Sequence, residues 1–217
     1  IIILRIRRSR QRYKSIHNSR AKSIIGSAEG VLYRKIFKTY RKISYFISPS
    51  NFLKEKLIEA DEKTYKNKVI AIHNFIELKQ INNIKKDNYV LYFGRLSEEK
   101  GLDIFLEVCK ELPNIHFKIA GTGWLENMCK EADEKLENVE FVGSKTGKEL
   151  ETTISKAKFP VYPSVWYENC PLSILESESL GTPVVTGNYG GMKELVENNS
   201  TGILIDNMNK EELKKAI

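Results

Sequence analysis

The chain has 217 residues, of which 41% are hydrophobic and 29% charged, and these ordinary values exclude a mainly disordered or fibrous protein. No apolar run approaches the roughly 20 residues of a membrane-spanning helix, and three widely spaced cysteines without a Cys-x-x-Cys pair argue against a disulfide framework or a zinc site. The net charge of +7 is concentrated in residues 1–60, which hold 15 Lys/Arg and three Glu; such a segment can bind nucleic acid, anionic lipid or an anionic substrate, or be a solvated face.

The first third of the chain has mainly helical patterns. Apolar residues recur at helical spacing over residues 15–40, with Arg and Lys between them, and residues 51–60 predict a second helix. Short apolar runs predict strands at 44–48 and 69–72. The polar, Lys/Asn-rich residues 79–88 then predict a linker.

From residue 89 onward, strand and helix patterns alternate strictly. The predicted strands are 89–93, 116–120, 139–142, 159–163, 183–186 and 203–205. The predicted helices are 102–112, 125–135, 148–156, 172–180, 192–197 and a last one from about residue 210. Short apolar strands joined by single helices predict an α/β domain with a doubly wound, Rossmann-like parallel sheet that is covered on both faces. Pro160 lacks the N–H of a strand residue, so we expect its strand to begin later or to bulge there.

The loops that follow the strands come first in the search for a site, because ligands bind at the carboxyl ends of such strands. The first loop, Gly94 to Gly101, carries Arg95 and Lys100, whose guanidinium and ammonium groups suit phosphate oxygens. The alternative is a solvated loop in which Lys100 pairs with a neighbouring glutamate.

Two other loops are rich in glycine. Gly121-Thr122-Gly123 resembles the start of a dinucleotide-binding fingerprint, although Glu126 stands where a third glycine is expected. Gly190-Gly191 precedes a short helical pattern and predicts a tight turn with free amides. In both places the alternative is a close approach to a neighbouring element rather than to a ligand.

The segment from Tyr167 to Glu176 is the most informative. Pro171 suits the first position of a helix, so Glu168 lies before that helix and Glu176 within it. The free N–H groups at the start of a helix attract a phosphate. A carboxylate on either side of that start suits the hydroxyls of a sugar and a ribose, whereas the alternative is a helix-dipole glutamate and a surface glutamate.

Taken together, these motifs resemble the retaining GT-B glycosyltransferases of family four (glycosyl transferases group 1). The resemblance rests on Arg95 and Lys100, Gly121-Thr122-Gly123, Glu168 and Glu176 with seven residues between them, and Gly190-Gly191, in this order on successive loops. Residues 47–53 and 72–76 resemble the end of the first domain of that family. The resemblance implies a nucleotide-sugar donor, either a UDP-, GDP- or ADP-sugar, and polysaccharide biosynthesis.

The resemblance also implies a role for each matching residue. Arg95, Lys100 and Glu168 are the expected catalytic residues: the two cations hold the diphosphate, and Glu168 contacts the donor sugar. Glu176 binds the ribose, and the turn from Gly143 to Lys145 lies near the base. The full expected donor-binding set is Gly94, Arg95, Lys100, Gly121, Gly123, Gly143, Lys145, Glu168, Asn169, Cys170, Pro171, Leu172, Glu176, Gly190 and Gly191. The resemblance implies no metal and no other cofactor.

The resemblance divides the chain into the tail of a first Rossmann-like domain (1–78), a linker (79–88) and a donor-binding domain cut short at its end (89–217). We therefore expect a fragment that binds donor without transferring sugar efficiently. The expected acceptor is a glycan or a lipid-linked saccharide, and the expected location is the cytoplasm, at the inner face of the membrane through the basic segment. No nucleic acid partner is expected. The competing hypotheses are a non-catalytic nucleotide-sugar binding module and a basic nucleic-acid-binding protein.

Overall fold

The computed structural model describes residues 32, 37, 39–78 and 84–217, so most of the helix expected over 15–40 lies outside it. The chain divides into two compact units. The first comprises Ile1–Ser48 and Leu53–Ile72, and the second Pro49–Phe52 and His73–Ile217. The long segment of the second unit therefore begins at His73, before the linker expected at residues 79–88.

The expected linker is described only from residue 84, and two of its residues are bonded to the second unit. The Lys86 ammonium donates to Thr182 Oγ1 over 2.7 Å, and the Asp87 N–H donates to the Lys156 carbonyl over 2.7 Å. This part of the predicted linker is therefore attached to the domain that follows it.

The described part of the first unit is built around two short parallel strands, β1 (Phe46–Ser48) and β2 (Val69–Ala71). Two helices, α2 (Asn51–Ala60) and α3 (Glu62–Tyr65), lie between these strands in the chain. Its small core consists of Leu57, Tyr65 and Val69, with Phe46, Leu53 and Ile58 packed against them. The sequence patterns missed α3, which is held by its N-cap Asp61: the carboxylate accepts bonds from the N–H and the hydroxyl of Thr64. Thr39–Lys42 is a 3₁₀ turn.

The second unit contains the expected parallel sheet, with the strand order β5-β4-β3-β6-β7-β8. The strands are β3 (Tyr89–Arg95), β4 (His116–Thr122), β5 (Val139–Gly143), β6 (Phe159–Tyr162), β7 (Val184–Gly187) and β8 (Gly202–Ile205). The helices are α4 (Leu102–Glu111), α5 (Glu126–Lys135), α6 (Gly147–Lys156), α7 (Leu172–Ser179) and α8 (Lys210–Ala216). Each of these six strands pairs in parallel with its neighbours in the sheet.

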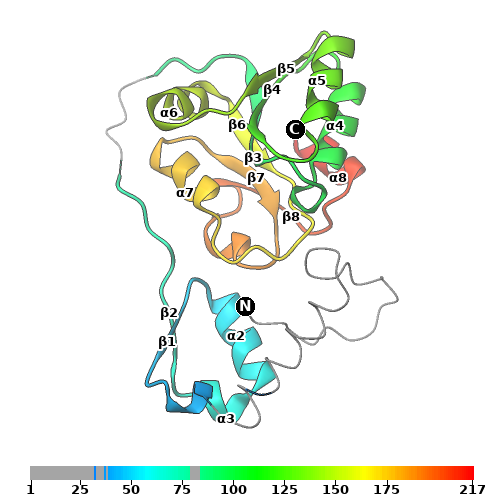
Figure 1. Ribbon diagram of the computed structural model, residues 1–217. Coiled ribbons are helices and arrows are strands. Elements are labelled where there is room, and N and C mark those ends of the chain that lie inside the picture. The colour runs from blue at the N-terminus through cyan, green and yellow to red at the C-terminus, as the bar shows by residue number, and fades with distance from the viewer. Residues whose placement is uncertain (1–31, 33–36, 38, 79–83) are drawn as a thin grey trace. The chain divides into compact units, whose positions relative to one another are not determined.

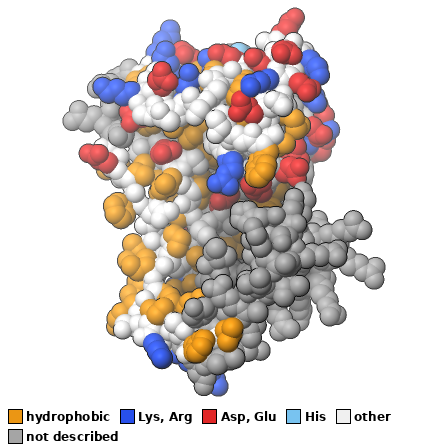
Figure 2. Space-filling model, in the orientation of Figure 1, with side chains coloured by type: hydrophobic (Ala, Val, Ile, Leu, Met, Phe, Trp, Pro, Cys, Tyr) orange, Lys and Arg blue, Asp and Glu red, His pale blue; other side chains and the backbone are white. Residues whose placement is uncertain are grey.

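Helices cover both faces of this sheet, as Figure 1 shows. Along β3, Val90 and Tyr92 pack with α4, α5 and α8 on one face. The alternate residues Tyr89, Leu91 and Phe93 pack with α6 and α7 on the other. Because every residue from 89 to 93 is buried, this strand reads as a continuous apolar run, as is typical of a parallel sheet. Over the face of the second unit seen in Figure 2, acidic and basic side chains are interspersed.

Three local predictions need correction. Strand β3 extends through Gly94 and Arg95, which were expected in the loop. Pro160 lies within β6, which begins at Phe159 and pairs with β3 at Phe159 and Pro160 without a bulge, while pairing with β7 begins only at Val161. The helix expected over 192–197 is a single 3₁₀ turn, Met192–Glu194.

The strand order creates a topological switch point between β3 and β6. From β3 the chain proceeds outward to β4 and β5, then returns to β6 and proceeds the other way to β7 and β8. The loops after β3 and β6 therefore diverge and leave a crevice at the carboxyl ends of these neighbouring strands, which is where such folds bind ligands. The three cysteines are all buried and free.

Candidate donor site

Two cavities open at this switch point and share four lining residues, Phe93, Gly94, Arg95 and Ser173. The first has a volume of about 380 Å³, and its other lining residues are Ala120, Gly121, Thr122, Ser144, Lys145, Leu150 and Glu176. The second has a volume of about 530 Å³, and its other lining residues are Tyr92, Lys100, Tyr162, Pro163, Ser164, Glu168, Pro171, Leu172 and Met192. The site is therefore elongated, with Arg95 and Ser173 in the middle and one carboxylate toward each end.

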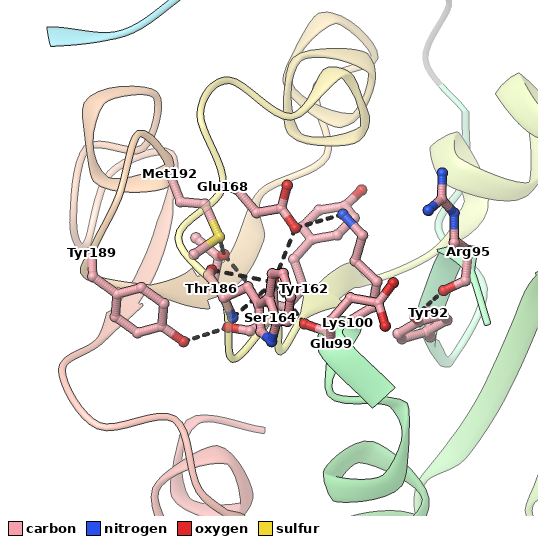
Figure 3. A network of polar contacts seen from close by, with 11 residues as sticks. Tyr92, Arg95, Glu99, Lys100, Tyr162, Ser164, Glu168, Thr186, Tyr189 and Met192 are labelled. Carbon is pink, nitrogen blue, oxygen red and sulfur yellow. Dashed lines mark hydrogen bonds and ion pairs between the residues drawn. The ribbon is translucent and has the colours of Figure 1, made fainter. Parts of the chain in front are cut away.

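Arg95 ends β3 and lines both cavities. Its backbone is fixed because the Tyr92 hydroxyl donates to the Arg95 carbonyl over 2.8 Å. Among the residues that the structure describes, no carboxylate forms an ion pair with its guanidinium, which points away from Glu168 in Figure 3. Arg95 thus presents a positive charge at the junction of the two cavities.

Lys100 is held by the loop that follows β6. Its ammonium lies 2.5 Å from Glu168 Oε1, and the side chains are 33% and 22% exposed (Figure 3). The alternative in which Lys100 pairs with a neighbouring glutamate of its own loop is therefore wrong: its partner is 68 positions away in the sequence. Gly101 adopts the left-handed region at φ +67°, which favours glycine. A Cβ at this position would also overlap with the Pro163 carbonyl oxygen, so the turn requires glycine for both reasons.

Glu168 is held at both its side chain and its backbone. Besides Lys100, the Ser164 hydroxyl lies 3.0 Å from the same oxygen, Oε1. The Glu168 carbonyl accepts a bond of 2.6 Å from the Gly191 N–H, and the Tyr189 hydroxyl donates to the Ser164 carbonyl. The loops after β6 and β7 are thereby tied together around Glu168 (Figure 3), and among the described residues Oε2 has no hydrogen-bond partner.

Helix α7 begins at the junction of the two cavities. Pro171 is its N-cap residue, one position earlier than expected, and the helix proper starts at Leu172. The buried Tyr162 fixes the first turn, because its hydroxyl lies 2.8 Å from both the Ser173 carbonyl and Ser177 Oγ. Burial raises the pKa of Tyr162 well above its ordinary value, so this hydroxyl stays neutral. The N–H groups of the first turn are suited to an anion at the middle of the site.

Glu176 lies on α7 and lines only the first cavity. It is half-buried, and burial raises the pKa of its carboxyl above the ordinary 4.5. Among the described residues, no positively charged side chain lowers the pKa of Glu176 again. The carboxylate is thus placed where it loses hydration without an ionic partner, as expected of a group that accepts hydrogen bonds from a ligand.

This raised pKa predicts that Glu176 destabilises the empty protein at neutral pH. The folded state binds the proton more tightly than the unfolded state, so the contribution of Glu176 to stability falls as the pH rises from about 4.5 through its own pKa. We expect Glu176→Gln to increase the free energy of unfolding at pH 7 by about 0.5 kcal/mol, a value reduced for partial exposure to solvent. Urea denaturation at pH 7 and pH 4 measures this gain, which should vanish at pH 4. Glu134→Gln, at an exposed position of α5, is the control, and a loss of stability in Glu176→Gln would contradict the assignment.

The structure brings most of the predicted donor-binding residues to the two cavities. Those that line at least one of them are Gly94, Arg95, Lys100, Gly121, Lys145, Glu168, Pro171, Leu172 and Glu176. The predicted residues outside both linings are Gly123, Gly143, Asn169, Cys170, Gly190 and Gly191. Direct donor contact by these six stays a prediction.

The positions of four of these outer residues have structural explanations. A Cβ at Gly123 would overlap with the Leu96 carbonyl oxygen, and one at Gly190 would lie 2.7 Å from the Glu168 carbonyl oxygen. The Gly191 N–H, expected to be free for a ligand, is used by Glu168, while the Cys170 carbonyl accepts a bond of 2.8 Å from Asn74 Nδ2. These residues therefore support the loops that form the site.

Sequence reasoning missed Ser164, Ser173 and Tyr189 as site residues. Ser164 and Ser173 line the cavities, and Tyr189 fixes Ser164. Their roles depend on the adjacency of β3 and β6 and of β6 and β7, which the structure shows and the order of the strands along the chain does not. Within the described ranges, no group of three His, Cys, Asp or Glu side chains could hold a metal ion.

Comparison with known proteins shows the family. Residues 74–217 match the sequence profile described as glycosyl transferases group 1. The chain belongs to this family. Its fold is the GT-B fold of these glycosyltransferases, because the parallel sheet matches solved GT-B structures. The matched residues 74–217 include all residues that line the two cavities, and the expectation of a Rossmann-like parallel sheet is confirmed.

Three similar proteins illustrate the relationship. An uncharacterized glycosyltransferase of Methanocaldococcus jannaschii is 26% identical over 94% of this chain and 56% of its own length. An amylovoran biosynthesis glycosyltransferase of Erwinia amylovora is 33% identical over 53% of this chain and 31% of its own length. The Anabaena protein HepE, solved in complex with UDP, superposes with a TM-score of 0.70 at 21% identity, covering 87% of this chain and 57% of HepE. The chain thus spans about half the length of relatives that it matches, or less. None of its described helices has the length and apolar character needed to cross a bilayer.

Proposed function

We propose that this glycosyltransferase-family chain binds a nucleoside-diphosphate sugar in the two joined cavities and that the protein transfers the sugar to a glycan or lipid-linked acceptor. The observation that carries the proposal is the order of groups along the site. Glu176 lies toward one end, Arg95 and the start of α7 in the middle, and Lys100 with Glu168 toward the other end. A nucleoside, a diphosphate and a sugar follow one another in the same order.

In this arrangement each group meets the chemistry that it favours. The two carboxylates accept hydrogen bonds from ribose and sugar hydroxyls, while Arg95, Lys100 and the first amides of α7 meet the diphosphate. The positive charges stabilise the negative charge that grows on the diphosphate as it leaves. On this basis we propose that transfer requires no metal ion or other cofactor.

The proposed reaction retains the configuration of the anomeric carbon. The bond between that carbon and the diphosphate oxygen breaks, and the acceptor hydroxyl forms a new bond on the same face of the sugar. The hydroxyl proton passes to the departing phosphate oxygen, so that the products are the glycosylated acceptor and a nucleoside diphosphate. Ser164 and Gly191 hold Glu168 in place while Lys100 serves the diphosphate.

Relatives support the choice of donor and acceptor class. HepE binds UDP, and the Erwinia relative is named for amylovoran biosynthesis. We propose UDP as the first donor nucleotide to test, with GDP- and ADP-sugars as the alternatives. We also propose a cytoplasmic location at the inner membrane face, with the basic segment of residues 1–60 as the contact to anionic lipid, and no nucleic acid partner.

Calorimetric titration tests donor binding and the roles of the two carboxylates. We expect UDP to bind in the presence of EDTA, and Glu176→Ala to weaken UDP roughly tenfold, the effect of losing hydrogen bonds to a charged group. Glu168→Ala should change the Kd of UDP by less than about twofold. It should instead reduce the affinity that a UDP-sugar gains over UDP.

The controls separate a folding defect from a binding defect. Far-UV circular dichroism should remain unchanged in both variants, and both should still unfold in a single cooperative transition. Binding that requires added magnesium or manganese would contradict the metal-independent mechanism. Equal losses of UDP affinity in the two variants would contradict the assignment of the nucleoside and sugar ends.

A further inference from the structure

Lys145 places a positive charge in the first cavity, outside the second cavity, which Lys100 and Glu168 line. It follows β5 and lines only the first cavity, together with Glu176, Leu150 and Ser144. Arg95 and Ser173, which line both cavities, lie where the two meet. The diphosphate therefore already has two cations without Lys145.

The ammonium group of Lys145 is only weakly engaged by the protein. Its side chain is 30% exposed, and its ion-pair partner Glu149 lies 3.9 Å away with a side chain that is 74% exposed. An exposed pair at this distance contributes little. Lys145 is thus a partly buried donor that remains available to a ligand in the first cavity.

The edges of the nucleic acid bases differ in what they offer such a donor. Uracil and guanine carry an exocyclic keto oxygen, which accepts a hydrogen bond from an ammonium group. Cytosine and adenine carry an amino group at the corresponding position, which is itself a donor and repels the cation. A lysine beside this edge of the base, which carries O4 of uracil or N4 of cytosine and O6 of guanine or N6 of adenine, therefore separates two classes of nucleotide independently of base size.

We propose that Lys145 is a specificity-determining residue that selects donors with a keto base, uracil or guanine, over donors with an amino base. This inference rests on the proposed function, because it places the nucleoside in the first cavity with its ribose toward Glu176. Leu150 supplies an apolar wall for the ring, and Lys145 donates to the keto oxygen at its edge.

Size-matched nucleotide pairs isolate the contribution of Lys145. The test measures the Kd of UDP, CDP, GDP and ADP by calorimetry in EDTA, for the natural chain and for Lys145→Met, which keeps the length of the side chain but removes the donor. We expect UDP to bind about tenfold more tightly than CDP, and any purine binding to favour GDP over ADP to a similar extent. In Lys145→Met these ratios should fall close to one, because only the keto nucleotides lose affinity.

Lys148→Met is the matched control, since Lys148 is exposed three residues further along the chain and lines neither cavity. It should keep the UDP to CDP ratio of the natural chain. Equal affinity for UDP and CDP in the natural chain, an unchanged ratio in Lys145→Met, or an equal loss for all nucleotides would overturn the inference and leave donor binding intact. An equal loss would assign Lys145 to the phosphates. Failure of all four nucleotides to bind the natural chain would overturn the proposed function itself.

Discussion

Replacing Arg95 with alanine is expected to weaken UDP binding by about a hundredfold without unfolding the protein. The guanidinium lines both cavities and has no carboxylate partner among the described residues, so its charge is available to the diphosphate. Loss of two charge-assisted hydrogen bonds accounts for a change of this size. The loop should keep its shape, because the Tyr92 hydroxyl is bonded to the Arg95 carbonyl rather than to the side chain.

Arg41→Ala is a matched control for this substitution. Arg41 is also exposed, and its carbonyl likewise accepts a bond from another side chain, the Lys68 ammonium, over 2.7 Å. It lies in the 3₁₀ turn of the first unit, and we expect its removal to leave the Kd of UDP unchanged. Calorimetry in EDTA measures both variants. If Arg95→Ala bound UDP as tightly as Arg41→Ala does, the diphosphate would have to lie elsewhere.

Replacing Gly191 with alanine is expected to cause a large loss of stability. A Cβ at this position would overlap with the carbonyl oxygen of Asn169 and lie 3.0 Å from the Cβ of Ser50. The backbone of Gly191, at φ −86°, is open to any residue, so the cost is steric alone. We expect the free energy of unfolding to fall by about 3 kcal/mol, and the thermal midpoint by about 6 to 12 °C.

Gly147→Ala distinguishes this steric cost from a conformational one. Gly147 has φ +53°, and a Cβ there would meet no atom within 4 Å. Its replacement should cost about 1 kcal/mol through backbone strain only. Denaturant unfolding of both variants makes the comparison. If Gly191→Ala were no less stable than Gly147→Ala, the close packing between the loops after β6 and β7 would not be present.

The fold was largely predictable because its signals are local. Buried parallel strands have apolar runs such as Tyr89–Phe93, and each helix between strands has its own apolar face. The errors also have local causes. The short helix α3 depends on a capping aspartate rather than on apolar spacing. Over 192–197, Met192, Leu195 and Val196 pack into the core although only Met192–Glu194 is helical, so apolar spacing overstated the helix.

The candidate site was predictable in its residue types but not in its internal contacts. Arg95, Lys100, Glu168 and Glu176 could be selected because each follows a strand or lies near the start of a helix. The pairing of Lys100 with Glu168 depends on the adjacency of β3 and β6, which the chain order conceals. For the same reason the role of Gly191, whose amide serves Glu168 rather than a ligand, could not be inferred from its neighbours in the sequence.

The ion pair between Lys100 and Glu168 has a consequence for how the empty site discriminates among small anions. An inorganic phosphate that takes the ammonium of Lys100 leaves Glu168 without its cationic partner, and an unpaired, partly buried carboxylate is costly. A simple polyol meets the opposite difficulty, because it offers hydroxyls to Glu168 but no charge to Lys100. Only a molecule that carries both an anionic group and nearby hydroxyls replaces both halves of the pair at once. We therefore expect inorganic phosphate alone or a free sugar alone to replace this pair less readily than one ligand that carries both chemistries.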